Sequence, residues 1–235
     1  MYKGKTILAV ITARGGSKGL PNKNLLLLAG RPLVAWSVLQ AKASRYVDRV
    51  IFSSEDARLI KAAKAAGADV PFVRPKELAQ DSTPGMLPFL HAITAIPEKY
   101  DYVMLLQPTS PLREPEDIDA CIRLCMASGA PACVSVKEVS DNPYWTYRLG
   151  ASGRLRSTMG CRKTIERRQD LPKVYALNGS IYIAEREHVL RKKTFITPRT
   201  AGYVMPEERS ADIDTAIDFK LVELLLKEKR RGGER

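Results

Sequence analysis

The residue types that bind metals or form disulfides are scarce in this chain. Among its 235 residues are only four cysteines and two histidines. The cysteines (Cys121, Cys125, Cys133 and Cys161) show neither metal-ligand spacing nor a C-x-x-C motif, so they indicate no zinc site and no redox-active pair. Free thiols buried in the protein are typical of a reducing compartment, which predicts a cytoplasmic location.

Long apolar runs and biased segments are also absent. No apolar stretch approaches the roughly 20 residues of a membrane helix. The first apolar run ends near Arg14 without a small-residue cleavage site, so a signal peptide is not expected. With 45% hydrophobic and 27% charged residues, the composition is that of an ordinary globular protein. A single domain spanning residues 1–235 is predicted, with no membrane partner.

Acidic residues are missing from the start of the chain. Asp48 is the first acid and follows eight lysines and arginines, while the net charge of the whole chain is +12. Such a basic segment indicates an acidic ligand or a basic surface, and the surface interpretation is preferred for Lys3, Lys5 and Lys42. A nucleic-acid-binding protein would explain the charge, but it leaves the ordered motifs below unexplained. No nucleic-acid partner is therefore expected.

Apolar runs alternate with helical patterns along most of the chain. This alternation predicts an α/β fold with a mainly parallel sheet and helices on both faces. The final helix begins near residue 215 and carries an apolar stripe that includes Ile217 and Leu221. The predicted strands are 6–11, 50–53, 70–73, 102–106, 132–136, 180–184 and 202–205, and the earlier helices are 32–44, 55–66, 84–96 and 114–128.

The pattern changes between residues 138 and 175. This segment is aromatic, basic and weakly periodic, with Tyr144, Trp145 and Tyr147 close together. It does not resemble another β-α-β unit. An inserted hairpin or arm is predicted, whose aromatic residues are covered either by a partner subunit or by the arm itself.

A glycine-rich basic loop, Ala13–Asn24, follows the first predicted strand. It holds three glycines, three cations and no acid. It is neither the G-x-G-x-x-G fingerprint nor a P-loop. Glycine lets backbone N–H groups face a ligand, and ligands of open α/β sheets bind at the carboxyl ends of strands. A phosphate site is therefore favoured over a basic turn, with Arg14 and Lys23 as its cations.

Two further motifs follow later strands. The run Gln107–Arg113 places an amide after the strand at 102–106, although Thr109 or Ser110 could instead cap the next helix. Asp212 and Asp214 stand just before the final helix, where two carboxylates can share one Mg²⁺. Alternatively, Asp214 N-caps that helix. The phosphate loop favours the metal interpretation, because Mg²⁺ commonly bridges carboxylates and a triphosphate.

These motifs, in this order, resemble the acylneuraminate cytidylyltransferase family from Thr6 to about Leu226. The similarity rests on four segments: 13–19, 105–113, 178–183 and 212–214. It implies a three-layer Rossmann-like fold of the nucleotide-diphospho-sugar transferase type, with residues 138–175 as a dimerisation arm. CMP-Kdo synthetases share the fold and a related loop, but the Gln107–Arg113 run is more similar to the sialic-acid branch.

The resemblance implies a dimeric, Mg²⁺-dependent enzyme that transfers CMP from CTP to the anomeric hydroxyl of a nonulosonic acid. The implied catalytic residues are Arg14, Lys23 and the metal ligands Asp212 and Asp214, and Lys18 has no assigned role. Neither His91 nor His188 is expected to act as a base. The implied CTP ligands are Ala13, Arg14, Ser17, Lys23, Asn24, Arg74, Asp81, Ser82 and Thr83. The implied sugar ligands are Gln107, Asn178, Tyr182, Phe195 and, across the dimer, Arg168.

The chain departs from the sialic-acid pattern in two places. Ala176 and Leu177 replace the Arg-Pro that often precedes the Asn-Gly pair. In the arm, Pro143-Tyr144-Trp145 stands where a lysine often follows a proline. Aromatic residues at this place suit a less polar sugar. The sequence therefore favours a deoxy sugar such as pseudaminic or legionaminic acid over N-acetylneuraminate.

Overall fold

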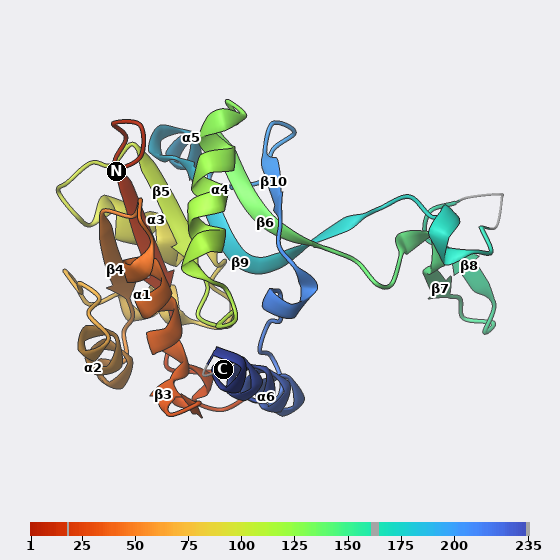
Figure 1. Cartoon of the computed structure of the whole chain (residues 1–235), viewed down its shortest axis with the longest axis horizontal. Helices are drawn as coiled ribbons and strands as arrows, with labels where there is room; N and C mark the ends of the chain where they lie inside the picture. Colours follow the sequence, from red (N-terminus) through yellow and green to blue (C-terminus); the bar gives the residue numbers. More distant parts are fainter. Residues whose placement is uncertain (18, 161–164, 234–235) are drawn as a thin grey trace.

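A six-stranded sheet forms the centre of the computed structural model, which describes residues 1–17, 19–160 and 165–233 (Figure 1). Lys18 and Cys161 lie outside the described residues. The strand order is β10-β6-β9-β5-β1-β4. The strands are β1 (Ile7–Thr12), β4 (Arg49–Ser53), β5 (Tyr102–Leu106), β6 (Ala132–Glu138), β9 (Tyr175–Glu185) and β10 (Ala201–Val204).

The sheet is mixed but mainly parallel, as the sequence predicts. Strand β1 pairs in parallel with β4 and β5, and β10 pairs in parallel with β6. Strand β9 runs antiparallel to both of its neighbours, β5 and β6. The carboxyl ends of β1, β4 and β5 therefore meet at one edge, where the motif-bearing loops begin.

Helices cover both faces of the sheet because β1 alternates its apolar side chains between them. Ile7, Ala9 and Ile11 enter one cluster, whereas Leu8 and Val10 enter the other. The first cluster is completed by α1 (Leu33–Ala43), α2 (Ala57–Ala65) and α4 (Pro115–Ala127). The second is completed by α3 (Met86–Thr94) and α5 (Arg186–Lys192). The three layers agree with the predicted fold class.

The last helix, α6 (Ala216–Gly233), packs on a third apolar cluster with the short strands β2 (Leu27–Leu28) and β3 (Arg31–Pro32) nearby. Leu28, Ile213 and Val222 are fully buried in this cluster. The Ile213 N–H donates to the Thr109 carbonyl at 2.9 Å. The chain before α6 is thereby fixed beside the loop that follows β5.

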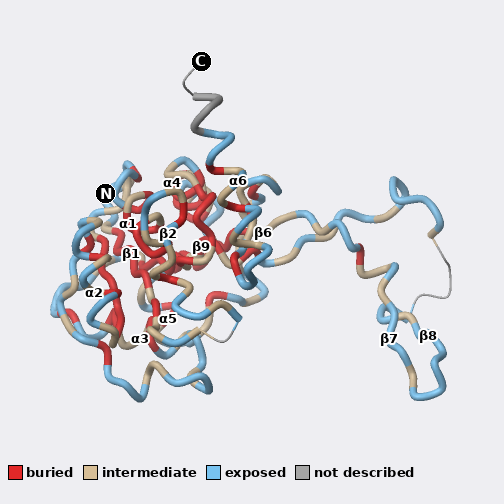
Figure 2. The backbone as a smooth tube through the Cα atoms, turned by 90° about the horizontal axis from the view of Figure 1, so that it is seen from below, coloured by how far each residue is buried: buried red, intermediate tan, exposed pale blue. Residues whose placement is uncertain are grey.

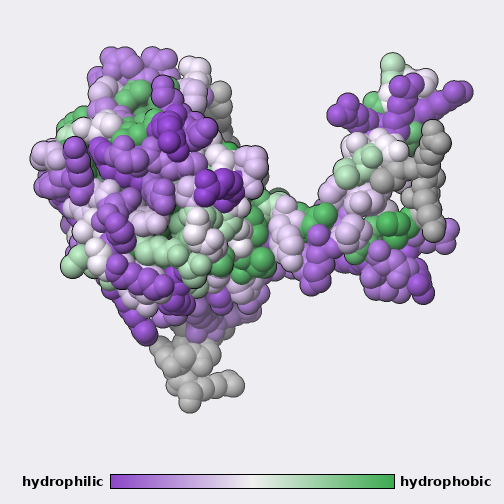
Figure 3. Space-filling view, turned by 90° about the horizontal axis from the view of Figure 1, so that it is seen from above, coloured by the Kyte–Doolittle hydropathy of each residue, from purple (hydrophilic) through white to green (hydrophobic). Residues whose placement is uncertain are grey.

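The predicted arm is a hairpin that projects far from the body (Figures 1 and 2). It contains β7 (Tyr147–Leu149) and β8 (Leu155–Ser157), and the chain reaches it from β6 and returns through β9. The side chains of Leu149 and Leu155 are 73% and 64% exposed. Figure 3 shows hydrophobic residues at the surface of this arm. The arm does not fold back over its own apolar side chains.

Two predicted details differ from the structure. Residues 70–73 form no strand, because Pro71 has no N–H and pairing ends at the isolated Ile51–Asp69 bridge. Strand β9 begins at Tyr175 and not at residue 180, since its first half pairs with the extended end of β6. The helix that carries His188 is the short, highly charged α5. Among the described residues, no helix has the length and apolar character needed to cross a membrane.

Candidate active site

The glycine-rich loop leaves β1 at the carboxyl edge of the sheet and packs closely on two neighbouring segments. A Cβ atom on Gly15 would lie 2.5 Å from Asp56 Oδ2. A Cβ atom on Gly19 would lie 2.6 Å from the carbonyl oxygen of Asp214. Both distances are too short for a real contact. The Asp214 carbonyl belongs to the backbone, so the path of the loop requires glycine at position 19, whereas a side chain at position 15 would force the Asp56 side chain to shift.

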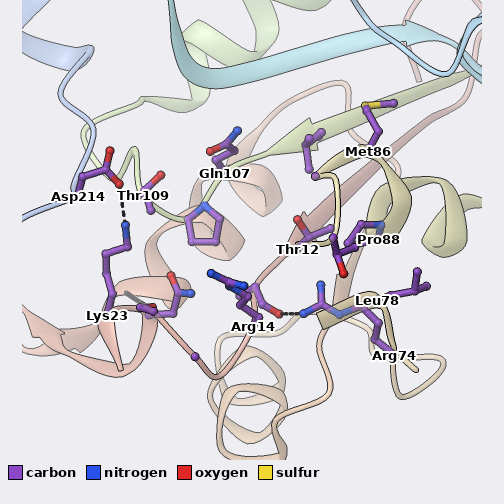
Figure 4. Close-up of a pocket in the computed structure, with 18 of the residues that line it drawn as sticks. Thr12, Arg14, Lys23, Arg74, Leu78, Met86, Pro88, Gln107, Thr109 and Asp214 are labelled. Carbon is purple, nitrogen blue, oxygen red and sulfur yellow. Dashed lines mark hydrogen bonds and ion pairs between the residues drawn. The ribbon is translucent and has the colours of Figure 1, made fainter. Parts of the chain in front are cut away.

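A cavity of about 890 Å³ opens above this loop (Figure 4). This volume is within the range of small-molecule sites. Residues from the loop, from the segment around Arg74, from the loop after β5 and from β9 contribute to its wall. Of the predicted site residues, the cavity is lined by Ala13, Arg14, Ser17, Lys23, Asn24, Arg74, Thr83, Gln107, Tyr182, Phe195 and Asp214.

Arg14 and Lys23, the two loop cations assigned to the phosphate site, are each paired with a carboxylate on another segment. Arg14 Nη1 lies 2.5 Å from Asp81 Oδ1. Lys23 Nζ lies 3.0 Å from Asp214 Oδ1 and also donates to the Ile213 carbonyl at 2.6 Å (Figure 4). Asp81 thus meets the cavity residue Arg14 without lining the cavity itself. A bound phosphate would compete with both carboxylates for these cations.

Arg74 is buried beneath the opposite end of the loop. Its Nη2 donates to the Ala13 carbonyl at 2.7 Å and to Glu55 Oε2 at 2.6 Å. Its buried Nε–H has no partner among the described residues, and neither does the buried Oδ1 of Asn24. Both residues line the cavity. Because unpaired buried polar atoms are costly, they indicate ligand groups that complete them.

The acidic pair stands on the loop before α6. The alternative that Asp214 caps this helix is wrong, because Thr215 and Asp218 form the cap. Asp218 N–H donates to Thr215 Oγ1 at 3.3 Å, and Thr215 N–H donates to Asp218 Oδ2 at 2.7 Å. The Asp214 carboxylate therefore remains available, with Lys23 as its partner.

Asp212 keeps contact with solvent, yet the protein around its carboxyl raises its pKa by desolvation. The nearby Asp214 charge adds to this increase in pKa, whereas a hydrogen bond from Thr109 opposes it. The two carboxylates are therefore close enough to interact. A Cβ atom on Gly179 would be 3.7 Å from both Asp212 Oδ2 and Gln107 Oε1, which places this carboxylate beside the Gln107 amide.

The acidic pair fits a magnesium ion that is completed by its substrate. Two carboxylates plus substrate phosphates form a common Mg²⁺ environment in enzymes. Across the described residues, no group of three or more His, Cys, Asp or Glu side chains is arranged to hold a metal. Asp212 and Asp214 would therefore bind the ion weakly without phosphate ligands.

An aromatic wall faces the other end of the cavity. The rings of Tyr182 and Phe195 are 5.5 Å apart, and Phe89 packs behind Phe195 at 5.1 Å. Leu105 and Gln107 line the same side. Burial raises the pKa of Tyr182, and the Asp212 charge adds to this effect. The phenol thus remains protonated at neutral pH and can donate a hydrogen bond.

Asn178 does not line the cavity, so the structure does not support the predicted contact between this residue and the sugar. It is 4% exposed and its amide is satisfied inside the protein. Its Oδ1 accepts from Ser135 Oγ at 2.6 Å, and its Nδ2 donates to Ser210 Oγ at 3.0 Å. These bonds hold the irregular part of β9 around Gly179, where its register against β6 shifts. Asn178 is therefore a positioning residue.

Three other predicted residues also lie off the cavity wall. Ser82 adjoins the lining residue Thr83 but does not line the cavity itself. Asp212 stands beside Gln107, as described above. Arg168 lies in the arm, which projects away from the body, so it does not reach the cavity of its own chain (Figure 2).

Several cavity residues were missed from the sequence. Thr109 was predicted only as a possible cap, and its hydrogen bond to Asp212 depends on the packing of two distant loops. Glu55, which contacts Arg74 and the loop without lining the cavity, comes two residues after β4, so its place at the carboxyl edge of the sheet could have identified it. Other missed members of the cavity wall have apolar or small side chains typical of a core, and these include Thr12, Leu78, Met86, Pro88 and Leu105.

Comparison with known proteins agrees with this geometry. The chain is 36% identical over 230 residues to a CMP-N,N'-diacetyllegionaminic acid synthase of Legionella pneumophila, covering 94% of this chain and 96% of that protein. It is 33% identical over 225 residues to an N-acylneuraminate cytidylyltransferase of Escherichia coli, covering 96% of this chain and 53% of that protein.

Solved structures share the fold at lower sequence identity. A CMP:2-keto-3-deoxy-manno-octonic acid synthetase complexed with CTP superposes with a TM-score of 0.70 at 18% identity, covering 95% of this chain and 99% of that one. A 4-diphosphocytidyl-2C-methyl-D-erythritol synthase of Anaerococcus prevotii has a TM-score of 0.65 at 14% identity, covering 95% and 97%. The family model described as cytidylyltransferase matches residues 8–230. A chain with these motifs around one cavity, matched over almost its whole length, belongs to the cytidylyltransferase family.

Proposed function

We propose that this protein transfers CMP from CTP to the anomeric hydroxyl of a nonulosonic acid and releases pyrophosphate. One observation carries the proposal: a single cavity joins the loop cations, the unpaired groups of Arg74 and Asn24, and an aromatic wall beside Gln107. The names of the relatives, which include legionaminic, pseudaminic and acylneuraminic acid enzymes, support the same reaction.

In this proposal the nucleotide lies between the glycine-rich loop and Arg74. Arg14 and Lys23 exchange their carboxylate partners for the phosphates of CTP. The Nε–H of Arg74 and the amide of Asn24 complete their hydrogen bonding on the cytidine. Ala13 and Ser17 line the loop side of the cavity, and Thr83 lines the other side, where Ser82 and Asp81 adjoin it.

We assign the magnesium ion to Asp212 and Asp214. When bound, Mg²⁺ supplies positive charge at the phosphates and thereby lowers the barrier to attack. Asp214 gives up its ion pair with Lys23 when the nucleotide arrives. Asp212, placed beside Gln107, brings the same carboxylate pair to the sugar end of the cavity.

The chemistry is one substitution at phosphorus. The anomeric oxygen of the sugar forms a bond to the α-phosphorus and passes its proton to water, while the bond from that phosphorus to the bridging oxygen breaks. Pyrophosphate leaves with the electron pair. Arg14 and Lys23 stabilise the negative charge that develops on this leaving group, which is electrostatic catalysis by fixed cations. Gln107 and Tyr182 orient the attacking sugar.

We further propose that the sugar is a deoxy, acetamido-bearing nonulosonic acid, such as legionaminic or pseudaminic acid. The wall formed by Leu105, Tyr182 and Phe195 offers apolar surface, and the side chains of these three residues contribute one polar atom, the Tyr182 hydroxyl oxygen. Methyl groups bury favourably against such a wall, whereas the glycerol hydroxyls of N-acetylneuraminate would lose water without finding partners.

The arm supports a proposal of dimerisation. Its leucines are exposed, and Arg168 is too far from its own cavity to act there. In a dimer, the arm would cover these side chains and bring Arg168 to the carboxylate of the sugar in the partner subunit. Sedimentation velocity tests this point, with a dimer expected for the native protein and a monomer for Leu149→Ser/Leu155→Ser. A native monomer would refute the dimer.

A cytoplasmic location is also proposed, on the basis of three buried free thiols.

The decisive experiment measures pyrophosphate release with CTP, Mg²⁺ and a panel of sugars. Legionaminic and pseudaminic acids are expected to be used more efficiently than N-acetylneuraminate. Kdo represents the alternative of a CMP-Kdo synthetase, which a structural neighbour of low identity suggests. Preference for Kdo would replace the proposed sugar class. Absence of release with every sugar would reject the proposed reaction.

Variants of the acidic pair test the metal assignment in the same assay. Asp212→Asn and Asp214→Asn are both expected to lose activity. In a variant that keeps some activity, the Mg²⁺ concentration needed for half-maximal activity should increase. Asp218→Asn is the matched control, since Asp218 caps α6 and belongs to the same acidic run. Full activity in both pair variants would show that the metal binds elsewhere.

A further inference from the structure

Glu55 connects the two sides of the nucleotide cavity with one carboxylate. Its Oε1 accepts from the Gly15 N–H at 2.8 Å, and its Oε2 accepts from Arg74 Nη2 at 2.6 Å. The Glu55 side chain is 17% exposed and the Arg74 side chain is 3% exposed. The glycine-rich loop and the buried arginine are therefore held by the same group.

The backbone around Glu55 fixes where this carboxylate stands. Ala13 N–H donates to the Ser53 carbonyl at 3.2 Å, and Arg74 N–H donates to the Ser54 carbonyl at 3.0 Å. Asp56 Oδ2 occupies the space where a side chain of residue 15 would begin. Because the two residues just before Glu55 are hydrogen-bonded to the segments that it joins, the carboxylate is preorganised before any ligand binds.

The charge of Glu55 has a second consequence. An acid beneath a triphosphate loop would repel the ligand unless a cation neutralised it. Arg74 provides that cation at hydrogen-bond distance, so its own positive charge is largely cancelled. The Nε–H of Arg74 has no hydrogen-bond partner within the described residues and is the donor that we assign to a ligand. A nearly neutral, fixed donor suits a carbonyl oxygen of a base better than a phosphate.

We propose that Glu55 is a positioning residue that directs Arg74 to hydrogen-bond to the nucleotide base rather than to bind a phosphate. The proposal rests on the proposed function, because it takes CTP as the occupant of the cavity. Glu55 fixes the direction of the Arg74 Nε–H and cancels its charge, and it holds the loop at Gly15. Phosphate binding is left to Arg14 and Lys23.

The variant Glu55→Gln tests this role. A glutamine keeps the shape of the side chain, but whichever way its amide turns, its NH₂ group faces either Arg74 Nη2 or the Gly15 N–H. Two donors then oppose each other, and the Arg74 charge is no longer cancelled. Glu55→Asp keeps the charge but is one methylene shorter, so it cannot reach both partners. Glu98→Gln is the matched control, since Glu98 pairs with Arg49 away from the cavity.

Isothermal titration measures the binding of CTP, UTP and inorganic tripolyphosphate to each protein in the presence of Mg²⁺. For Glu55→Gln we expect CTP affinity to decrease about 10- to 100-fold, the range for losing a hydrogen bond to a charged group. Tripolyphosphate affinity should change less than about threefold, and UTP affinity should decrease in parallel with CTP affinity, because uracil carries the same C2 carbonyl as cytosine. Glu55→Asp should change in the same direction, and Glu98→Gln should equal the native protein.

The outcomes separate this proposal from the proposed function. Equal weakening of CTP and tripolyphosphate would make Glu55 a support of the loop only, and unchanged CTP binding would remove its role altogether. Failure of the native protein to bind CTP would reject the proposed function instead. If Glu55→Gln does not fold, as judged by thermal unfolding, the ratio of CTP to tripolyphosphate affinity in Glu55→Asp decides the question.

Discussion

Replacement of Asn178 by alanine tests whether this residue supports the site or touches the sugar. In the structure its amide faces the interior and bonds to Ser135 and Ser210. The same Oδ1 accepts from the N–H of Ser180, which is itself fully buried. We therefore expect Asn178→Ala to act mainly on stability.

The expected loss follows from what the substitution leaves behind. Ser135 Oγ retains Ile181 as a partner, and Ser210 Oγ retains the Pro206 carbonyl. The Ser180 N–H, in contrast, loses its hydrogen bond to Asn178 Oδ1, and such a buried unpaired N–H costs about 1–3 kcal/mol. The missing amide leaves a small cavity that costs about 1 kcal/mol more. A total near 2–4 kcal/mol corresponds to a decrease in melting temperature of roughly 5–15 °C for a chain of this size.

Thermal unfolding measures the stability, and steady-state kinetics below the transition measure the KM for the sugar. That KM should change less than about threefold, since the amide does not line the cavity. Gln80→Ala, which removes an exposed amide, serves as the control for stability. An increase of tenfold or more in the KM for the sugar at an unchanged melting temperature would show that Asn178 binds the sugar and that the interior assignment is wrong.

Three further predictions follow from the loop and the acidic pair. Gly19→Ala should weaken CTP binding in titration about tenfold, because its methyl group meets the Asp214 carbonyl. Gly16→Ala, whose methyl group would enter open space, should leave the melting temperature unchanged. An unaffected CTP affinity of Gly19→Ala would contradict the close packing. Lys23→Met should lower kcat about 100-fold or more through loss of charge at the leaving group, and a change confined to KM would oppose this role. Asp212 has a raised pKa in the fold, so its ionised form destabilises the free protein above that pKa. Asp212→Asn should therefore raise the melting temperature at neutral pH but not below about pH 4. An equal increase in melting temperature at both pH values would refute the raised pKa of Asp212.

The sequence predicted the fold class because local patterns carry that information. Alternating apolar side chains in β1 and the helical stripes determine which face of each element is buried. Two strand details were missed for different reasons. Pro71 ended a pattern that otherwise resembles a strand, and the first half of β9 depends on pairing with the end of β6, which is distant in the sequence.

The candidate site was predictable in part for the same reason. Parallel strands deliver the loops that follow them to one edge, so motifs after β1 and β5 had to meet. Asn178 shows where this reasoning fails. Being next to Gly179 in a motif does not reveal which way an amide points, and the register shift of β9 turns it inward.

The sequence alone determined the alternation of strands and helices, the cationic character of the loop and the presence of an acidic pair, because these depend on local composition and spacing. Only the tertiary structure decided which groups are paired. It placed Asp81 on Arg14, Asp214 on Lys23 and Glu55 on Arg74, contacts that join segments far apart in the chain. Such contacts depend on the directions of side chains at the meeting point of several loops, and no spacing along the chain encodes those directions.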